Sequence, residues 1–403
     1  MRVLVADRLN EESLDEMRAL GVEVRYDPEL RAEALPEALE DVNVLVVRGT
    51  EVSAEAVHAG NALNLIIRAG AGVSNIDVAA ASERGIYVAN CPGKNAEAVA
   101  ELTFALIGCL DRRIPDAVAS LRAGRWEKDE YARATGLAGR RIGILGLGHV
   151  GRAVLRLARA YGLVPFATSR SLTAAKAAEL GVRRIETPEE LAREVDVFTV
   201  HLELVERTRG IVSRRVLEAL PDGAIFVNTA RPELVDYDAL TELVPKKRLR
   251  VGLDVFPNEP PGRSGTYEHP LFRSGLVYGT PHIGASTDEA QTAIAAECVR
   301  ILRSFVTKGE VPNVVNISAT SWSRYQLVVR HLDKVGALAN VLAVLKRHDI
   351  NIHDLDSTLF EGGKAACVKI RIGRRPSEDC LQEIMAFSDE VLHVDLVTLP
   401  NLA

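Results

Sequence analysis

The chain has 403 residues, of which 47% are hydrophobic and 26% charged, and its formal net charge is -6 at pH 7. This length allows two or three globular domains, and the acidic balance argues against a nucleic-acid partner or an anionic membrane surface. The five cysteines show no CxxC spacing, so neither a disulfide framework nor a metal site is expected. Because the first residues lack signal-peptide features and no run approaches the ~18 apolar residues of a membrane span, we expect a cytoplasmic protein.

Short apolar runs of strand length alternate with helical patterns through the first two thirds of the chain. This rhythm predicts βα units and parallel sheets covered by helices on both faces. It restarts near Arg140, which favours two Rossmann-like α/β domains over one large sheet. Long helices are expected over residues 96–111 and 286–307, where they could bridge the domains. The expected strands lie in RVLVAD, NVLVVRG, NLIIRAG, IYVANC, RIGILGLG, LVPFATS, DVFTVHL, AIFVNTA and RVGLDVF.

A third unit begins near Tyr325, where the pattern changes after GEVPNVVNIS. It reads as strand, helix, strand, strand, helix and strand. This βαββαβ order is that of a ferredoxin-like fold, a small sheet with helices on one face. The segments are YQLVVRHL, VGALANVLAVLKRHD, INIHDLDSTLF, KAACVKIRIG, SEDCLQEIMAF and VLHVDLVTL.

A GxGxxG fingerprint follows an apolar strand in RIGILGLGHVGRAVL and opens an amphipathic helix. In that context the first glycine permits a tight turn, the second lets the backbone approach a pyrophosphate, and the third lets helix pack on strand. The segment therefore predicts a dinucleotide site. Its residues are Gly146, Gly148, His149, Val150 and Gly151.

The acid that would grip an adenosine ribose about 20 residues later is missing, because Ser169 and Arg170 stand in its place. A hydroxyl and a guanidinium suit a 2′-phosphate, whereas an acid would repel it. The pair favours NADP(H) over NAD(H). The alternative is that Arg170 stacks on the adenine or faces solvent while NAD is used.

Three charged residues follow predicted strands in FVNTARPELVD, GLDVFPNEP and PHIGAS: Arg231, Glu259 and His282. Ligands gather at the carboxyl ends of strands in open α/β sheets, so these side chains are expected to meet near a nicotinamide. A guanidinium binds a carboxylate through two parallel hydrogen bonds, and a carboxylate beside histidine favours the imidazolium. Singly, each residue would be read as a surface ion pair or a capped loop.

The motifs RAGAGVSNID, NAEAVAELT, GILGLGHVGR, NTAR, DVFPNEP and PHIGAS occur in one order along nearly the whole chain. On these residues the chain resembles the D-isomer-specific 2-hydroxyacid dehydrogenase family, and within it the D-3-phosphoglycerate dehydrogenases with a C-terminal ACT domain. The resemblance implies a substrate-binding domain over 1–95 and 285–312, a nucleotide-binding Rossmann domain over 96–284, and an ACT regulatory domain over 323–403.

The resemblance also implies residue roles. Arg231 would anchor the substrate carboxylate, Glu259 would pair with the imidazole, and His282 would move the proton. The glycine-rich loop containing Ala71 and Gly72 would offer backbone N–H groups to the substrate, and Arg48 would lie near a distal phosphate or else be a surface charge. Further cofactor contacts would come from His201, Thr229, Ala230 and Asp254.

Two segments depart from the family pattern near the site. Pro232 and Glu233 follow Arg231 where relatives carry two glycines, so less backbone freedom is expected there. Glu203 and Val205 replace proline and threonine in HLELVERT.

In the third unit, HLDKVGALANVLAVLKRHDINI resembles an ACT module that binds small polar ligands at a subunit interface. His331, Asp333 and Asn351 fall where serine-regulated members place their ligand contacts. Asp333 replaces an amide often found there. The expected effector is an amino acid such as serine, and the alternative is a purely dimerising module.

The expected function is that of an NAD(P)-dependent oxidoreductase interconverting a D-2-hydroxyacid and its 2-oxo acid, foremost 3-phosphoglycerate and 3-phosphohydroxypyruvate in serine biosynthesis. One alternative is an NADPH-dependent glyoxylate or hydroxypyruvate reductase. An alternative from another class is a non-enzymatic, nucleotide-sensing corepressor scaffold. A homodimer or homotetramer is expected.

Overall fold

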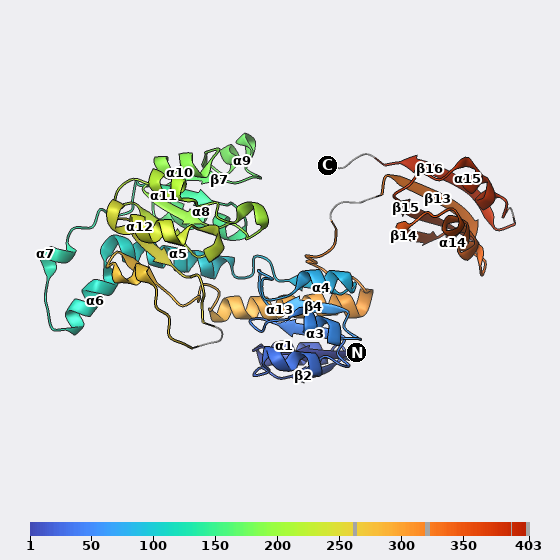
Figure 1. Ribbon diagram of the computed structural model, residues 1–403, viewed down its shortest axis with the longest axis horizontal. Helices are drawn as coiled ribbons and strands as arrows, with labels where there is room; N and C mark the ends of the chain where they lie inside the picture. Colours follow the sequence, from blue (N-terminus) through green and yellow to red (C-terminus); the bar gives the residue numbers. More distant parts are fainter. Residues whose placement is uncertain (261–263, 319–322, 388, 400–403) are drawn as a thin grey trace. The chain divides into compact units, whose positions relative to one another are not determined.

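The structure is a computed structural model that describes residues 1–260, 264–318, 323–387 and 389–399. The chain forms two compact units, Met1–Asn316 and Ile317–Ala403, which are described separately (Figure 1). Within the described ranges, no helix is long and apolar enough to cross a membrane.

The amino-terminal lobe of the first unit is built on a five-stranded sheet in the order β2-β1-β3-β4-β5, and every neighbouring pair is parallel. The strands are β1 (Arg2–Val5), β2 (Glu23–Tyr26), β3 (Val44–Val47), β4 (Leu65–Arg68) and β5 (Tyr87–Asn90). Its helices are α1 (Glu11–Arg18), η1 (Ala32–Ala34), α2 (Leu35–Ala38), α3 (Ala54–Ala59) and α4 (Val78–Glu83).

The central lobe is built on a seven-stranded parallel sheet in the order β12-β11-β10-β9-β6-β7-β8. The strands are β6 (Arg141–Leu145), β7 (Val164–Thr168), β8 (Arg183–Arg184), β9 (Val197–Val200), β10 (Ile225–Asn228), β11 (Arg250–Leu253) and β12 (Val277–Gly279). The helices are α5 (Ala96–Arg112), α6 (Ile114–Arg122), α7 (Lys128–Tyr131), α8 (His149–Ala160), α9 (Ala174–Glu179), α10 (Pro188–Glu194), η2 (Glu206–Thr208), α11 (Arg214–Ala219), η3 (Pro232–Leu234), α12 (Tyr237–Lys247) and η4 (Pro270–Arg273).

Apolar side chains fill both faces of each sheet, which explains why the central strands read as continuous hydrophobic runs. Every residue of β3 (VLVV) and of β9 (VFTV) is buried. In the amino-terminal lobe, one face packs against α1 and α13 (Asp288–Lys308) and the other against α2, α3 and α4. The sequence-based expectation of parallel α/β sheets is confirmed.

Two long helices exchange between the lobes, as the sequence suggested. Helix α5 follows β5 of the first sheet but buries Phe104 and Ile107 in the core of the second sheet. Helix α13 follows β12 of the second sheet but buries Ile294 and Leu302 in the core of the first. The amino-terminal lobe is therefore made from both ends of this unit, and the chain crosses between lobes twice.

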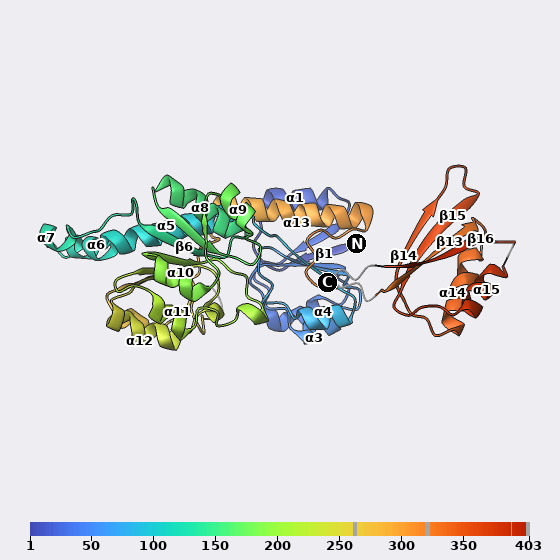
Figure 2. The same cartoon turned by 90° about the horizontal axis from the view of Figure 1, so that it is seen from above.

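The second unit is an antiparallel sheet in the order β14-β15-β13-β16 with two helices on one face (Figure 2). Its elements are β13 (Tyr325–Leu332), α14 (Ala337–Arg347), β14 (Ile352–Leu359), β15 (Ala365–Ile372), α15 (Glu378–Met385) and β16 (Val391–Thr398). The expected βαββαβ order is present. The other face of the sheet carries charged pairs such as Asp356 with Lys369 at 3.7 Å.

Candidate active site

A cleft of about 920 Å³ lies between the two lobes of the first unit. The amino-terminal lobe lines it with Arg48, Arg68 and the glycine-rich loop after β4. The central lobe lines it with Glu259, and His282 enters from the connection between β12 and α13. The cleft thus collects side chains from the carboxyl ends of strands in both sheets, where open α/β folds bind ligands.

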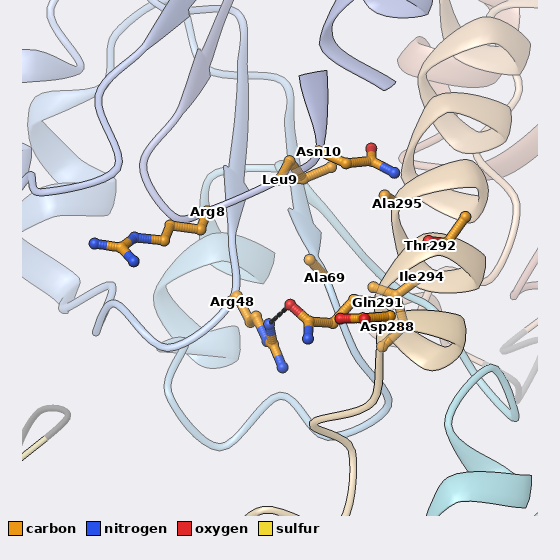
Figure 3. A pocket seen from close by; sticks show the side chains of 10 residues that line it. All are labelled: Arg8, Leu9, Asn10, Arg48, Ala69, Asp288, Gln291, Thr292, Ile294 and Ala295. Atoms are coloured by element: carbon orange, nitrogen blue, oxygen red, sulfur yellow. Dashed lines mark hydrogen bonds between the residues drawn. The ribbon is translucent and has the colours of Figure 1, made fainter. Parts of the chain in front are cut away.

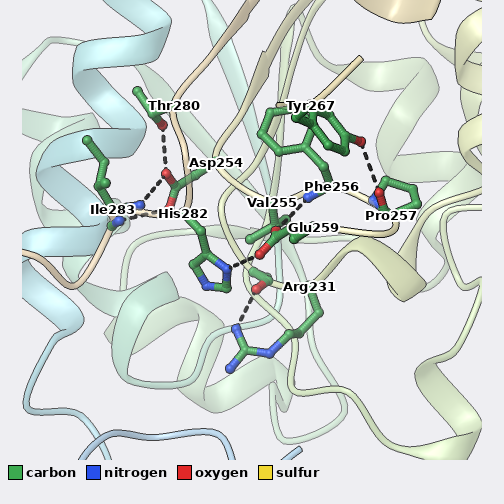
Figure 4. Close-up of polar contacts among 12 residues, drawn as sticks. Arg231, Asp254, Val255, Phe256, Pro257, Glu259, Tyr267, Thr280, His282 and Ile283 are labelled. Atoms are coloured by element: carbon green, nitrogen blue, oxygen red, sulfur yellow. Dashed lines mark hydrogen bonds and ion pairs between the residues drawn. The ribbon is translucent and has the colours of Figure 1, made fainter. Parts of the chain in front are cut away.

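His282 and Glu259 form a close pair at the centre of this cleft (Figure 4). His282 Nδ1 lies 2.7 Å from Glu259 Oε2, and the Phe256 N–H donates to Glu259 Oε1 at 2.8 Å. Burial by itself would raise the pKa of Glu259, but these hydrogen bonds and the charges of His282 and Arg231 outweigh burial and lower it. Glu259 is therefore an ionised partner beside the His282 ring.

The turn that carries His282 is held by the buried carboxylate of Asp254. Its Oδ1 accepts from Thr280 Oγ1 at 2.7 Å and from the Ile283 N–H at 2.8 Å, and its Oδ2 accepts from the Gly284 N–H at 2.8 Å. Burial raises the pKa of Asp254, while these three bonds oppose the rise. His282 has φ +52, a conformation uncommon for residues other than glycine, and the clamp sustains it. The cofactor contact expected for Asp254 stays a prediction.

Arg231 reaches the opposite lobe from the end of β10. Its backbone is extended (φ -142, ψ 142), the conformation that a following proline prefers, and Pro232 opens the 3-10 turn η3. The departure from the two-glycine pattern is thereby accommodated without strain at Arg231. A Cβ on Gly72 would collide with Arg231 Nη2, so the guanidinium lies directly against the glycine-rich loop.

The glycine-rich loop presents free donors beside that guanidinium. The N–H groups of Ala71, Gly72 and Val73 donate no hydrogen bond to any residue that the structure describes. The loop is held through its carbonyls, because Asn90 Nδ2 donates to Ala71 O at 2.6 Å. Successive free N–H groups next to an arginine make a concavity suited to a carboxylate.

Arg68 joins this cluster, although sequence reasoning did not select it. Its Nε is buried and has no hydrogen-bond partner among the described residues. Burial lowers the pKa of Arg68 to about 10, with further lowering by the charges of Arg231 and Arg48. The sequence contained a signal for this residue, because Arg68 is a cation that ends the buried run NLIIR and begins the motif RAGAGV. The structure thus places the guanidinium groups of Arg48 and Arg68 in the cleft, with Arg231 near enough to act electrostatically on Arg68.

The glycine fingerprint has the shape that a dinucleotide requires. Gly146 has φ +99, and a Cβ on it would meet His201 O at 2.6 Å, while a Cβ on Gly151 would collide with Gly146 O. Around Gly148 no atom lies within 4 Å of such a Cβ. Gly148 and the exposed His149 therefore border open space at the start of α8, where a pyrophosphate could approach the backbone.

His201 lies behind this loop and is buried. Neither ring nitrogen has a hydrogen-bond partner among the described residues, and burial lowers the pKa of His201 to about 3. The imidazole is therefore neutral. Nearby, Thr229 Oγ1 lies 3.0 Å from Thr103 Oγ1 of α5, and this contact ties the end of β10 to the crossing helix. The orphaned imidazole nitrogens fit a site whose remaining partner is a bound group.

The end of β7 carries the two residues expected to read the ribose. Ser169 is half-buried and Arg170 is exposed. The turn after the strand is closed by the Leu172 N–H, which donates to Ser169 O at 3.0 Å. Both residues thus lie at the end of β7, the neighbour of the strand that carries the fingerprint, with the serine less exposed than the arginine.

The three expected effector residues are not brought together within one copy of the second unit. His331 is buried near the end of β13 and its Nε2 has no partner among the described residues, whereas Asp333 and Asn351 are exposed. Asn351 precedes β14. The first residue of β14, Ile352, and the first residue of β13, Tyr325, both pair with Ile372 of β15. Tyr325 and His331 are six residues apart, which is about 20 Å along a strand.

Comparisons with known proteins agree with this geometry. Residues 104–284 match the family described as D-isomer specific 2-hydroxyacid dehydrogenase, NAD binding domain. A hydroxypyruvate reductase from Thermotoga maritima is 38% identical over 74% of this chain and 96% of that protein. The chain belongs to the D-isomer-specific 2-hydroxyacid dehydrogenase family. Its central lobe is the nicotinamide-dinucleotide-binding part of the fold.

Two other members show the breadth of the resemblance. A D-3-phosphoglycerate dehydrogenase from Methanocaldococcus jannaschii is 36% identical over 83% of this chain, and the match covers 64% of that protein, less than two thirds of its length. The structure of an NADPH-dependent glyoxylate/hydroxypyruvate reductase from Sinorhizobium meliloti, in complex with NADP and malonate, is 27% identical with a TM-score of 0.68. It covers 78% of this chain and 96% of that one.

Replacing two fingerprint glycines should separate folding from cofactor binding. In Gly151→Ala the new methyl collides with Gly146 O, so we expect both a loss of about 2 kcal/mol in unfolding free energy and at least about tenfold weaker dinucleotide binding. In Gly148→Ala the methyl enters open space, so stability should change by less than about 0.5 kcal/mol while binding still weakens. Denaturant unfolding and calorimetric titration with NADH and NADPH measure both.

The matched control is Gly108→Ala, in α5, where a Cβ also meets no atom within 4 Å. It should leave dinucleotide affinity unchanged and stabilise the helix slightly. Full affinity in Gly148→Ala would show that the cofactor does not approach this loop.

Proposed function

We propose that the protein is an oxidoreductase that interconverts a D-2-hydroxyacid and its 2-oxo acid, with 3-phosphoglycerate and 3-phosphohydroxypyruvate as the substrate pair. The observation that carries the proposal is the His282–Glu259 pair in a cleft shared with Arg48 and Arg68, with the charge of Arg231 acting on Glu259. The amino-terminal lobe (1–95 and 285–312) would bind the acid, and residues 96–284 would bind the dinucleotide.

The substrate carboxylate would sit between Arg231 and the free N–H groups of the loop after β4. Arg231 Nη2 lies against Gly72, so one carboxylate can accept from the guanidinium and from the backbone. Both anchors flank the cleft that His282 enters, so C2 of the acid would be directed toward the imidazole. Holding the acid at two points removes most of its rotational freedom before reaction.

His282 would transfer the proton at the C2 oxygen. Nδ1 is engaged by Glu259, so Nε2 is the nitrogen available to the substrate. In oxidation Nε2 takes the hydroxyl proton, and in reduction it returns a proton to the forming alkoxide. When bound, the nicotinamide ring supplies the acceptor or donor of the C2 hydride. The ionised Glu259 stabilises the imidazolium that appears as the proton arrives.

The number of cations in the cleft supports a substrate with a second acidic group. Arg231 is occupied by the carboxylate in this scheme, which leaves Arg48 and Arg68 for a distal anion. A phosphate takes two guanidinium groups well, whereas the hydroxymethyl of hydroxypyruvate is neutral and offers them no charge. The second candidate, a hydroxypyruvate or glyoxylate reductase, is supported by relatives with those names.

Steady-state kinetics with NADH and NADPH against phosphohydroxypyruvate, hydroxypyruvate and glyoxylate test the proposal. We expect the highest kcat/KM with phosphohydroxypyruvate. His282→Asn should lower kcat by about 100-fold or more because the proton carrier is lost, while dinucleotide affinity stays within about twofold. Asparagine is the replacement of choice because it tolerates the positive φ of this position.

A higher kcat/KM with hydroxypyruvate would instead identify a reductase. Absence of turnover with every combination of cofactor and substrate would rule out the enzymatic function and favour a nucleotide-sensing scaffold. Glu259→Gln keeps an acceptor for His282 but removes the charge, so its kcat should fall by about tenfold or more. Wild-type kcat in either variant would contradict the role assigned to that residue.

We also propose that NADP(H) is preferred over NAD(H). The exposed Arg170 and the half-buried Ser169 at the end of β7 support this preference, because no carboxylate at these two positions opposes a 2′-phosphate. A relative solved in complex with NADP is consistent with NADP use in the family. The opposite preference would mean that Arg170 faces the adenine or solvent.

The double variant Ser169→Asp, Arg170→Ala should reverse the cofactor preference. Losing the guanidinium and adding a carboxylate each act against the 2′-phosphate, so the ratio of kcat/KM for NADPH over NADH should fall by about 100-fold. The control Ser171→Asp adds the same charge two residues later, at an exposed position. An unchanged ratio in the double variant would show that this stretch does not read the 2′-position.

For the second unit we propose an ACT-type module whose amino-acid site needs two copies. The buried, unpaired Nε2 of His331 near the strand-to-helix turn supports a polar ligand there. Asn351 lies about 20 Å away along the sheet, so it could join Asp333 and His331 only from another copy. The alternative is that the module binds no ligand and only joins subunits.

Serine and other amino acids can be screened on the full chain by thermal shift and by sedimentation. We expect the active amino acid to raise Tm and to favour the associated species, and His331→Ala or Asn351→Ala to abolish both effects. Binding by a strictly monomeric sample would contradict a site shared between copies. If no amino acid binds, the alternative that the module only joins subunits would remain.

A further inference from the structure

A second cavity of about 340 Å³ lies beside Arg48, at the carboxyl ends of the strands of the first sheet (Figure 3). The first sheet has the order β2-β1-β3-β4-β5, so the chain winds in opposite directions from β1 and from β3, and this side cavity opens near their ends. Arg48, Ala69, Gln291 and Ile294 line both the side cavity and the main cleft. Arg48 therefore lies on the boundary, here called the partition, between the side cavity and the main cleft.

The backbone of Arg48 is held by Asp7, which follows β1. Asp7 Oδ2 accepts three N–H groups in succession, from Arg48 at 2.6 Å, Gly49 at 3.0 Å and Thr50 at 3.0 Å. A carboxylate that gathers consecutive N–H groups fixes the path of the loop and fills its anion-binding concavity. The charge of Asp7 also favours the protonated form of Arg68.

The guanidinium of Arg48 is held by Gln291, on the second turn of α13. Arg48 Nη1 donates to Gln291 Oε1 at 3.1 Å (Figure 3). An arginine flanked by empty volume on two sides is not fixed by packing, since little fills the space into which it could turn. The orientation of Arg48 therefore depends on polar contacts, and the bond to Gln291 is one of them.

We propose that Asp7 and Gln291 are positioning residues that keep Arg48 aimed into the main cleft and so set the preference for an acid with a distal phosphate. This inference rests on the proposed function and names two residues that make its substrate selection possible. Without Gln291, the guanidinium loses one of the bonds that orient it, and the side cavity gives it room to turn away from the distal anion. Without the Asp7 charge, the loop that carries Arg48 loses its anchor.

Because neither Gln291 nor Asp7 is hydrogen-bonded to His282 or Glu259, their loss should act on KM and not on kcat. For Gln291→Ala we expect the KM for phosphohydroxypyruvate to rise about tenfold, the size of one lost charge-assisted contact, with kcat within about twofold. The KM for hydroxypyruvate, which has no phosphate, should stay within about twofold. Asp7→Asn, which keeps one acceptor oxygen, should show the same pattern to a smaller degree.

The matched control is Thr292→Ala, which changes another residue lining the side cavity and should leave both KM values unchanged. Inorganic phosphate titrated calorimetrically into wild type and Gln291→Ala gives a second readout that needs no turnover, with about tenfold weaker binding expected in the variant. If wild type turns over none of the acids, the proposed function fails, and the phosphate titration still tests the positioning role. Equal rises of KM for both substrates, or equal phosphate affinity in the two proteins, would overturn the inference.

Discussion

The buried charge of Arg68, close to the charges of Arg231 and Arg48, is the constraint around which the cleft is organised. Burial together with the other two cations brings the pKa of Arg68 down to about 10, so the group is still charged at neutral pH but costs free energy to keep so. An anionic ligand relieves this cost. Since Arg231 comes from one lobe and the other two arginines from the other, the ligand that relieves the repulsion also joins the lobes.

The chemistry on the other side of the cleft depends on the ends of three neighbouring strands. Beyond β10, β11 and β12 the backbone ladder continues, with the Asp254 N–H donating to Asn228 O at 3.1 Å and the Thr280 N–H to Leu253 O at 2.9 Å. The loops that leave these ends carry the guanidinium, the carboxylate and the imidazole of the proposed reaction. Their relative positions are thus set by sheet register, and Asp254 adds the local clamp on the His282 turn.

Sequence patterns predicted those features that follow from burial or from glycine geometry. Strands buried on both faces gave continuous apolar runs, and two of the three fingerprint glycines, Gly146 and Gly151, stood where a Cβ would collide with a neighbouring carbonyl. Three short or edge strands were missed, because β2 (EVRY) is only partly buried, β8 has two residues and β12 has three. Such strands are specified by their neighbours and leave little pattern of their own.

The same distinction explains which parts of the candidate site could be predicted. Arg231, Glu259 and His282 stand in motifs, so their resemblance to a family located them. Asp7 and Gln291 make their contacts between distant segments, such as the bond joining Arg48 and Gln291 across 243 residues of sequence. Nothing local marks such a residue. A polar side chain becomes a positioning residue only when the fold brings it to the group it holds.

The residues expected to bind an effector in the second unit illustrate a different limit, in which a motif suggests a site that one copy does not assemble by itself. His331 and Asn351 belong to one motif, but His331 lies near the end of β13 whereas Asn351 lies level with its start. A ligand that contacts both must therefore be held by two copies, and its binding free energy then appears as free energy of association. Effector binding and subunit association would be thermodynamically coupled, so a change at either residue should alter both.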